Sequence, residues 1–309
     1  MTFQQFHLDP RLQAGIKAAG YVTPTPIQQQ AIPGILAGRD LLGLAPTGTG
    51  KTAAFMLPIL HHLLKQQPRR ENGRAPVRVL IVAPTRELAE QIRQSAVALS
   101  QKTGLRSIAV YGGVGKKPQI DALRRGADIV VACPGRLLDL AGERAIDLSR
   151  VEILVLDEAD RMFDMGFLPD IRRILKLVPE KRQTLFFSAT MPADVDKLAR
   201  QILKNPATVS IGARAPVKTV SHTLYPVTPK LKTPLLLAML ERTATGRVLI
   251  FTRTKRRARF LARDLEQQGY NVSALQGNMS QIKRQKAIDG FRSGRHDILV
   301  ATDVASRGI

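Results

Sequence analysis

The stretch LLGLAPTGTGKTAAF, residues 41–55, constrains the fold of this chain more than any other segment. It begins with a short apolar run, passes through a glycine-rich turn and continues with residues typical of the start of a helix. The backbone N–H groups of such a turn, together with the N-terminus of the helix, form a nest that binds anions. The succession of strand, turn and helix therefore predicts a phosphate site in an α/β sheet.

The residue types in this turn suggest a role for each position. Lys51 can reach the β and γ phosphates of a nucleotide, the Thr52 hydroxyl can bind Mg²⁺, and Gly48 and Gly50 leave the backbone unhindered. The general pattern GxxxxGK[ST] has glycine where this chain has Ala45, so a strict pattern search misses the site. A glycine-rich loop without a ligand is the alternative. The predicted phosphate-binding residues are Ala45, Pro46, Thr47, Gly48, Thr49, Gly50, Lys51 and Thr52.

Short runs rich in Val, Ile and Leu recur along the chain between helical patterns. Such continuous runs are typical of parallel strands that are covered on both faces. They occupy residues 77–84, 106–113, 128–134, 151–160 and 183–190, and then 247–252, 271–277 and 297–303. Between the two series, residues 205–220 hold one more short strand followed by Gly, Ala, Arg and Pro without a clear period, which indicates a linker. We expect two α/β domains in tandem.

The run VEILVLDEAD, residues 151–160, ends in acidic residues. Open parallel sheets bind ligands at the carboxyl ends of their strands, and we expect this strand to neighbour the one before the glycine-rich turn. Asp157 can hold Mg²⁺ through water, and Glu158 can orient and deprotonate an attacking water. Two adjacent acids at a strand end can also be merely solvated, or cap the next helix. Together with Lys51 and Thr52 they make most of a site for phosphoryl transfer to water.

The charge balance of the chain points to a polyanionic partner. Lys and Arg number 47 against 25 Asp and Glu, which gives a net charge of +22. An aromatic content of 5% without tryptophan argues against a protein that holds nucleic acid mainly by stacking bases, so a reader of the backbone fits better. From Ala213 onward there are 18 basic and 6 acidic residues. The helical cluster of Lys255, Arg256, Arg257 and Arg259 can also be only a solvated face.

The sequence excludes a secreted disulfide scaffold and a zinc ribbon. Its single cysteine, Cys133, cannot form an internal disulfide or a CxxC metal pair. The chain holds no run of about eighteen apolar residues, and its start, MTFQQFHLDPRL, lacks the pattern of a signal peptide. We therefore expect a soluble, cytoplasmic protein without a membrane partner.

Nine short motifs follow one another in a recognisable order. The first half holds APTGTGKT (45–52), PTREL (84–88), Gly112–Gly113, PGR (134–136), DEAD (157–160) and SAT (188–190). The second half holds FTRTK (251–255), QGNMSQIKR (276–284) and ATDVASRG (301–308). This set resembles the DEAD-box RNA helicases over nearly the whole chain, and the basic segment PRRENGRAP with the short N-terminus resembles the bacterial RhlE-type members most. The resemblance implies ATP and Mg²⁺ as cofactors and RNA as the substrate.

The resemblance also implies a division of the chain and a site for adenine. The implied fold class is α/β, with two RecA-like parallel-sheet domains in tandem (the P-loop NTPase fold), the second of them incomplete. The implied segments are 1–29 (the Q motif, for adenine recognition), 30–211 (the ATP-binding domain), 212–218 (linker) and 219–309 (the helicase C-terminal domain). Gln28 would pair with the adenine edge, Tyr21 would stack on the ring, and Phe3 would brace the site. By its residues alone, GYVTPTPIQ (20–28) is only a helix start.

Further residues acquire roles from the same resemblance. Asp303 joins the ATP contacts, while Asp160, Ser188 and Thr190 link the DEAD acids to the RNA-bound closed state. The implied RNA contacts are Pro84, Thr85, Arg86, Gly113, Pro134, Gly135 and Arg136, and then Arg253, Gly277 and Thr302. These positions lie at strand ends and helix starts, where N–H groups and hydroxyls hold phosphates and 2′-OH groups without reading bases. Cys133 stands where the family usually has Thr, and a thiol is the poorer helix cap.

The function expected from the resemblance is ATP-dependent local unwinding of RNA duplexes, with ATP and RNA in the cleft between the domains. Single strands and short duplexes would bind independently of sequence, whereas ribonucleoprotein or RNA-degradation partners cannot be read from the residues. The chain stops at Ile309, before the family's arginine-finger motif, so we expect a fragment or a naturally truncated product. The alternative function is a protein that binds or anneals RNA without efficient ATP turnover. RNA-stimulated release of phosphate from ATP distinguishes the two.

Overall fold

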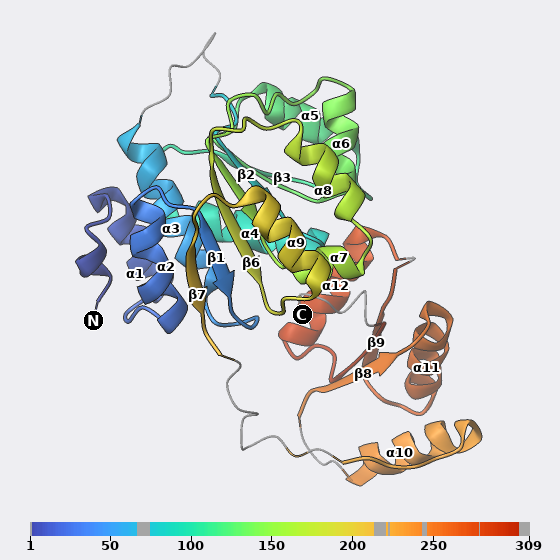
Figure 1. Cartoon of the computed structure of the whole chain (residues 1–309). Coiled ribbons are helices and arrows are strands. Elements are labelled where there is room, and N and C mark those ends of the chain that lie inside the picture. The colour runs from blue at the N-terminus through green and yellow to red at the C-terminus, as the bar shows by residue number, and fades with distance from the viewer. Residues whose placement is uncertain are drawn as a thin grey trace. The chain divides into compact units, whose positions relative to one another are not determined.

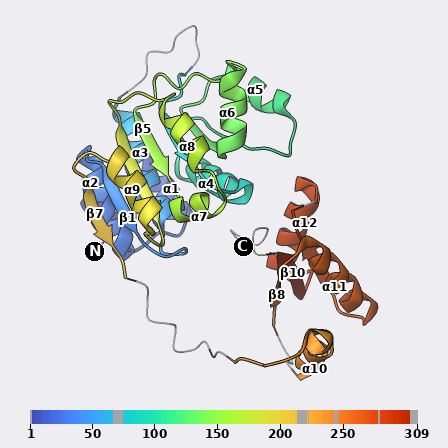
Figure 2. The ribbon, with the colours of Figure 1, turned by 45° about the vertical axis from the view of Figure 1, so that its right-hand side comes forward.

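The computed structural model divides the chain into two compact units, Met1–Arg214 and Ala215–Ile309. Figures 1 and 2 show the chain from two directions. The structure describes residues 2–66, 75–212, 221, 223–242, 246–277 and 279–302. Most of the predicted linker, residues 213–218, lies outside these described residues.

The first unit is built on a sheet of seven strands in the order β3-β4-β2-β5-β6-β1-β7. Every described pair in it is parallel. All four residues of β2, β4 and β5 are buried, which explains their uninterrupted apolar sequences. The predicted strands are confirmed. Their bounds are β1 Leu41–Leu44, β2 Val79–Val82, β3 Ser107–Val110, β4 Ile129–Ala132, β5 Ile153–Leu156, β6 Gln183–Ser188 and β7 Ala207–Ser210.

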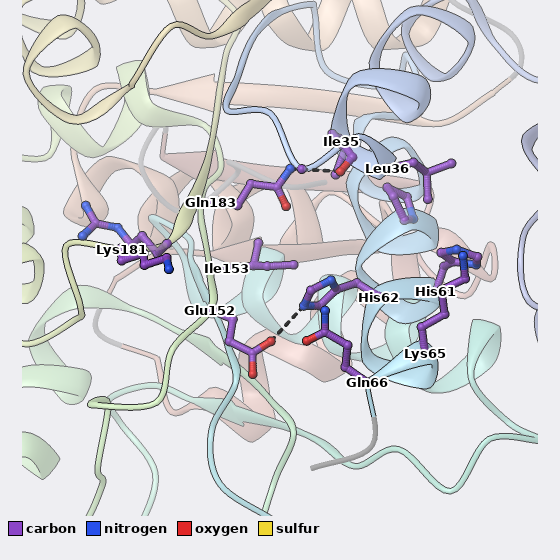
Figure 3. Close-up of a pocket in the computed structure, with 13 residues that line it drawn as sticks. Ile35, Leu36, His61, His62, Lys65, Gln66, Glu152, Ile153, Lys181 and Gln183 are labelled. Carbon is purple, nitrogen blue, oxygen red and sulfur yellow. Dashed lines mark hydrogen bonds and ion pairs between the residues drawn. The ribbon is translucent and has the colours of Figure 1, made fainter.

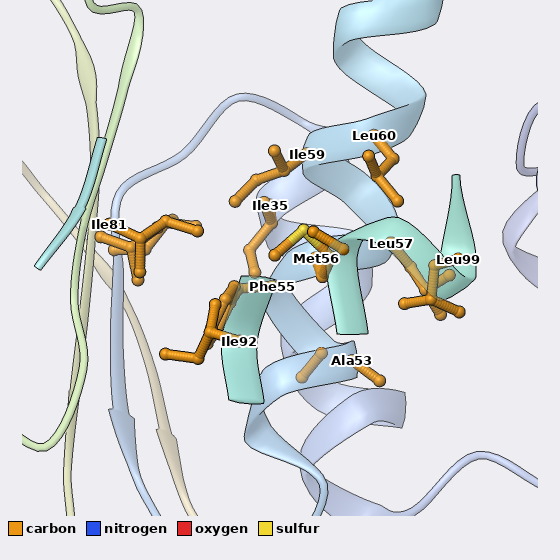
Figure 4. Packing of buried hydrophobic residues seen from close by; sticks show 14 of the residues in the cluster. Ile35, Ala53, Phe55, Met56, Leu57, Ile59, Leu60, Ile81, Ile92 and Leu99 are labelled. Carbon is orange, nitrogen blue, oxygen red and sulfur yellow. The ribbon is translucent and has the colours of Figure 1, made fainter. Parts of the chain in front are cut away.

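Helices cover both faces of this sheet. Side chains along a strand alternate between faces, so Val79 and Ile81 of β2 join one hydrophobic cluster while Leu80 and Val82 join another. Helices α2, α3 and α4 pack into the first cluster, part of which Figure 4 shows, and α6 to α9 pack into the second. The helices are α1 Gln13–Ala18, α2 Pro26–Leu36, α3 Lys51–Lys65, α4 Arg86–Leu99, α5 Lys116–Arg124, α6 Pro134–Gly142, α7 Ala159–Asp164, α8 Leu168–Leu175 and α9 Ala193–Ile202, with 3₁₀ turns η1 Phe3–Phe6 and η2 Pro10–Leu12.

The second unit holds a parallel sheet of three strands in the order β8-β10-β9. One face packs against α10 and α11 through residues such as Leu261 and Val300, and the other packs against α12 through Ile288 and Leu299. The predicted second α/β series is therefore confirmed. The bounds are η3 Pro229–Leu231, α10 Lys232–Arg242, β8 Val248–Thr252, α11 Lys255–Gln267, β9 Val272–Leu275, α12 Gln281–Arg292 and β10 Ile298–Thr302. In the described part of the chain no helix is long and apolar enough to span a bilayer.

Candidate functional site

The glycine-rich loop lies between the end of β1 and the first residue of α3. Gly48 and Gly50 adopt φ angles of 83° and 93°, in the left-handed region that favours glycine. A Cβ at Gly50 would come within 2.6 Å of the Gln28 side-chain nitrogen. Position 50 therefore requires glycine for two reasons: its φ angle is positive, and the Gln28 side chain leaves no room for a Cβ.

Gln28 connects the start of α2 to this loop. Its side-chain Nε2 donates a hydrogen bond to the Gly50 carbonyl (3.1 Å), and its Oε1 accepts one from the backbone N–H of Thr25 (2.9 Å). The residue is 3% exposed. The helix start predicted from GYVTPTPIQ is present, since α2 begins at Pro26. The role of Gln28 toward adenine stays a prediction, but the structure places its amide against the loop that would hold phosphates.

Two aromatic rings near the N-terminus stack on one another. The centroids of Phe3 and Tyr21 lie 6.0 Å apart with 23° between the ring planes. Phe3 is buried and also meets Phe6 edge-on. Tyr21 is only partly buried, and its ring also borders a hollow of about 300 Å³ beside η1 and α1. Phe3 is thus placed to support Tyr21, while the stacking of Tyr21 on a base stays a prediction.

Lys51 is held inside the loop. Its side chain is 7% exposed, and its Nζ donates to the carbonyl of Ala45 at 2.7 Å. A buried ammonium needs such an acceptor because burial without one is costly. Ala45 is itself fully buried in the hydrophobic core, and its N–H donates to the Ser188 carbonyl at 3.0 Å. Alanine therefore fits where the general pattern has glycine, because its methyl group packs in the core.

The two predicted acids follow β5 directly. Asp157 is 2% exposed, and this burial raises its pKa to about 6, against the opposing pull of the Lys51 charge. Its Oδ1 accepts the backbone N–H of Glu158 at 3.0 Å. Glu158 has a φ of 53°, which is uncommon for a residue other than glycine and costs roughly 1 kcal/mol or more. Strain of this kind is typical of functional sites.

The expectation that the strand of the acids neighbours the strand of the loop is wrong. β6 lies between β5 and β1, because crossover connections do not preserve chain order in the sheet. The two loops nevertheless meet beyond the end of β6, where the Thr47 hydroxyl donates to Glu158 Oε1 at 3.3 Å. The other oxygen, Oε2, forms an ion pair with Arg161 Nη1 at 3.0 Å. The sequence prediction missed Arg161, although its i+3 spacing from Glu158 on a helix start was a usable signal.

The three residues predicted to couple ATP to RNA lie in one hydrogen-bond network. Asp160 Oδ2 accepts from both the backbone N–H (2.9 Å) and the hydroxyl (2.8 Å) of Thr190. The Ser188 hydroxyl donates to the Thr190 carbonyl at 2.7 Å and accepts the Asp160 N–H at 3.2 Å. This network ties the end of β6 to the start of α7, next to the acids.

The donor set fits a magnesium ion that binds together with a nucleotide. Asp157 supplies a buried carboxylate, and Thr52 supplies a hydroxyl in the first turn of α3. Among the described residues no group of three or more His, Cys, Asp and Glu side chains could hold a metal. Mg²⁺ is usually bound by one or two carboxylates, with phosphates and waters completing its shell. Asp157 and Thr52 agree with such a shell.

Predicted RNA contacts converge at the ends of β2, β3 and β4. Thr85 caps α4, since its hydroxyl accepts the Leu88 N–H at 3.2 Å. Gly113 has a φ of 79°, and a Cβ there would clash with the guanidinium of Arg86. Both Nη groups of Arg136 donate to the carbonyl of Val114 at 3.1 Å. Pro84 precedes Thr85, while Pro134 and Gly135 form the first turn of α6.

Cys133 occupies the N-cap position of α6 without forming a side-chain cap. Its thiol is buried, and this burial raises its pKa to about 12, so the group stays a neutral, weak acceptor. The absence of a side-chain cap agrees with the expectation of weaker capping, and the hydroxyl of Thr85 on α4 shows the bond that Cys133 does not make.

The predicted contacts of the second unit share the carboxyl edge of its sheet. Arg253 follows β8, Gly277 follows Gln276 at the end of β9, and Thr302 ends β10. Thr302 pairs with Thr252 in the parallel register of β10 and β8. Asp303, a predicted ATP contact, lies outside the described residues.

A pocket of about 460 Å³ lies in the first unit at the amino-terminal ends of the strands, on the side away from the glycine-rich loop (Figure 3). Glu152 accepts from Arg78 Nε (2.7 Å) and Nη2 (2.8 Å), and it lies 2.8 Å from His62 Nε2. Burial raises the pKa of Glu152, but the hydrogen bonds from His62 and Arg78 outweigh it and lower the pKa to about 2. Arg78 also donates to the carbonyls of Leu63 and Gln66 at the end of α3. These bonds join β2, β5 and α3, which indicates a structural role.

Comparison with known proteins gives consistent matches along the chain. The family model "DEAD/DEAH box helicase" matches residues 25–198, and "Helicase conserved C-terminal domain" matches residues 231–309. The rice protein "DEAD-box ATP-dependent RNA helicase 24" is 45% identical over 304 residues, which are 97% of this chain and 39% of that protein. The Arabidopsis protein "DEAD-box ATP-dependent RNA helicase 30" is 43% identical over 310 residues, which are 99% and 52% of the two chains. This chain therefore spans about half the length, or less, of these two relatives.

A solved structure is similar as well. The crystal structure of a DEAD box protein from the hyperthermophile Methanococcus jannaschii aligns with a TM-score of 0.63 and 34% sequence identity. The alignment covers 100% of this chain and 82% of that one. This similarity identifies the two parallel-sheet units as tandem RecA-like domains.

Proposed function

Because this chain belongs to the DEAD/DEAH box helicase family, we propose that it is an ATP-dependent RNA helicase that unwinds short duplexes locally. The observation that carries the proposal is the meeting of Thr47 with Glu158 and of Asp160 with Thr190 at one edge of the first sheet. This edge holds the phosphate loop, the candidate base and the coupling network together. ATP hydrolysis and RNA binding can therefore be linked through a few hydrogen bonds.

In the proposed reaction each group at this edge has one task. Lys51 would exchange the Ala45 carbonyl for the β and γ phosphates of ATP. Asp157 and Thr52 would hold Mg²⁺, which when bound neutralises charge that develops on the phosphates. Glu158, oriented by Thr47 and Arg161, would position the attacking water and take its proton. Gln28 and Tyr21 would select adenine.

RNA would bind to the backbone donors at the starts of α4 and α6 and to Arg86. N-terminal N–H groups and hydroxyls bind phosphates and 2′-OH groups but carry no base information. Binding independent of sequence follows, and contacts to the 2′-OH favour RNA over DNA. The surplus charge of +22 supports a polyanionic substrate.

We also propose a branch of the family and a location in the cell for this protein. Membership of the RhlE-type branch rests on the basic segment at residues 68–76, of which 68–74 lie outside the described residues. A cytoplasmic location rests on the RNA substrate and on the single cysteine, Cys133.

The test is to measure phosphate release from ATP by the complete protein with and without RNA, next to unwinding of a short RNA duplex. We expect RNA to stimulate hydrolysis, and single strands of equal length and different sequence to do so equally. RNA binding without any stimulation would favour the alternative of an RNA-binding or annealing protein. A strong preference for one sequence would contradict backbone recognition.

A further inference from the structure

Helix α11 carries its positive charges at the end where they are least favourable. Four of its first five residues are cationic, its first turn has no acidic residue, and its last turn has no basic one. The N-terminus of a helix bears a partial positive charge, so cations there destabilise the helix. In α8 the order is the favourable one, with Asp170 in the first turn and Arg172 and Arg173 in the last. The stability of α11 does not account for its charge order.

The outward face of α11 combines these cations with an exposed ring. Ala258, Leu261, Ala262 and Leu265 face the hydrophobic core, which leaves Arg256, Arg259, Phe260 and Arg263 outward at helical spacing. Phe260 is 40% exposed. The guanidinium groups of Arg256 and Arg259 lie 5.5 and 5.6 Å from the centre of its ring. A face that is merely solvated gives no reason for an aromatic residue at this position.

This face adjoins a predicted RNA contact. Arg253 lies at the carboxyl edge of the second sheet, and Thr254 after it caps α11 by accepting the Arg257 N–H at 3.2 Å. Figures 1 and 2 show α11 beside the strands of its unit. Arg257 has another partner than the arginines near Phe260, since it donates to the Thr233 hydroxyl of α10. An RNA strand that passes Arg253 therefore comes next to the first turn of α11.

We propose that Arg256, Arg259, Phe260 and Arg263 form an additional single-stranded RNA site, in which the arginines bind phosphates and a base stacks on Phe260. Guanidinium groups bind phosphates, and aromatic rings stack on any base, so the site is tolerant of sequence. An acidic protein segment could use the arginines but has no base to stack on the ring. The proposal rests on the proposed function, because it extends the path of the RNA that the helicase binds.

A tryptophan at position 260 makes the ring directly observable. The chain contains no tryptophan, so Phe260→Trp introduces a single fluorescent reporter. We expect single-stranded RNA to quench its emission as a base stacks on the indole, and polyglutamate at equal charge to leave it unchanged. An unchanged emission at saturating RNA would overturn the proposal. Equal quenching by polyglutamate would also overturn it, and would assign the face to an acidic protein partner.

The arginines are tested by charge removal with a matched control. Arg256→Gln with Arg259→Gln should reduce the slope of log affinity against log salt by about 1.4, since each phosphate contact on a single strand contributes about 0.7. Lys230→Gln with Lys232→Gln removes the same charge from exposed positions of the same unit and should leave the slope unchanged. Phe260→Leu should weaken binding roughly five- to 150-fold. Equal effects of the two double variants would show that only total charge matters and would refute the site.

The outcome for this site can be separated from that for the proposed function. If RNA stimulates ATP hydrolysis by the unsubstituted protein while the α11 variants keep full RNA affinity and salt slope, the additional site is refuted and the helicase function stands. No RNA binding by the unsubstituted chain would refute both.

Discussion

Asp160 and Thr190 are joined by two hydrogen bonds to the same carboxylate oxygen, one from the Thr190 backbone N–H and one from its hydroxyl. The two residues lie 30 positions apart in the chain. The pair links the loop that carries the two predicted catalytic acids to the end of β6. A pair of bonds to one charged oxygen is stronger and more directional than a single neutral one.

Removing the hydroxyl of this pair should uncouple hydrolysis from unwinding. Thr190→Val keeps the shape of the side chain and the backbone N–H bond but loses the bond at 2.8 Å. A hydrogen bond to a charged group contributes about 1.5 kcal/mol or more, so we expect duplex unwinding to fall by roughly tenfold or more. ATP affinity should stay unchanged. Thr190→Ser retains the hydroxyl and should restore unwinding; if it behaves like the valine variant, the bond to Asp160 is not the coupling element.

Glu158→Gln tests the candidate base. The amide has the same shape and can still meet Thr47, but it cannot take a proton from water. We expect ATP binding to persist and turnover to fall by a factor on the order of 10² or more. Asp164→Asn, an exposed change at the end of α7, the helix that follows Glu158, should leave turnover unchanged. A loss of ATP affinity as large as the loss of rate would assign Glu158 to binding or to folding.

Gln28→Ala tests the choice of base. The variant removes the amide that bonds to Gly50 and Thr25, and with it the proposed partner of the adenine edge. The ratio of ATP to GTP affinity should fall by roughly tenfold or more, because a site built to hydrogen-bond a group discriminates strongly against its absence. Gln29→Ala is the matched control, since among the described contacts the Gln29 side chain bonds only to the Pro24 carbonyl. An unchanged ratio in the Gln28 variant would leave it with a structural role in the phosphate loop.

Cys133→Thr should supply the missing cap of α6. A threonine hydroxyl at this position can accept an N–H of the first turn, as Thr85 does on α4. We expect the free energy of unfolding to rise by about 0.5 to 2 kcal/mol and unwinding to improve, because α6 is the helix that resemblance places against RNA. Cys133→Val matches threonine in shape but has no hydroxyl, so it should not share the gain. Equal stability of the two variants would show that packing, not capping, decides this position.

The sequence was sufficient to predict local features of this fold. Every residue of β2 is buried, so its uninterrupted apolar run indicated a strand directly. Ala45 shows the limit of a fixed pattern, because burial of its methyl group explains the departure from glycine only once the core is known. Gln28 confirms the predicted helix start, since it lies in the first turn of α2. Its hydrogen bond to Gly50 was not predicted from the sequence, and its pairing with adenine stays a prediction.

The order of the strands and the contacts between distant residues could not be predicted from the sequence. The order of strands depends on how crossovers pack, and no local pattern indicated that β6 separates β5 from β1. Arg78 and Glu152 lie 74 residues apart, and neither position has a periodicity that points to the other. Arg161 could have been found by its helical spacing from Glu158, but its role depends on the strained backbone at Glu158.

The ion pair between Arg78 and Glu152 predicts how stability responds to acid. The folded state lowers the pKa of Glu152 from 4.5 to about 2, so the folded chain binds fewer protons at Glu152 than the unfolded chain does. This contribution to stability is fully present above about pH 5 and is lost as the pH falls toward 2.

Glu152→Gln should therefore lower the free energy of unfolding at pH 7 by about 1 to 3 kcal/mol, because Arg78 is 3% exposed and would lose its charged partner. Urea unfolding at pH 7 and at pH 3 measures the difference, which should shrink at the lower pH. Glu180→Gln, at an exposed position, should change stability by less than about 0.5 kcal/mol at either pH. A difference between Glu152→Gln and the parent chain that did not depend on pH would mean that the carboxylate charge is not what stabilises this edge of the sheet.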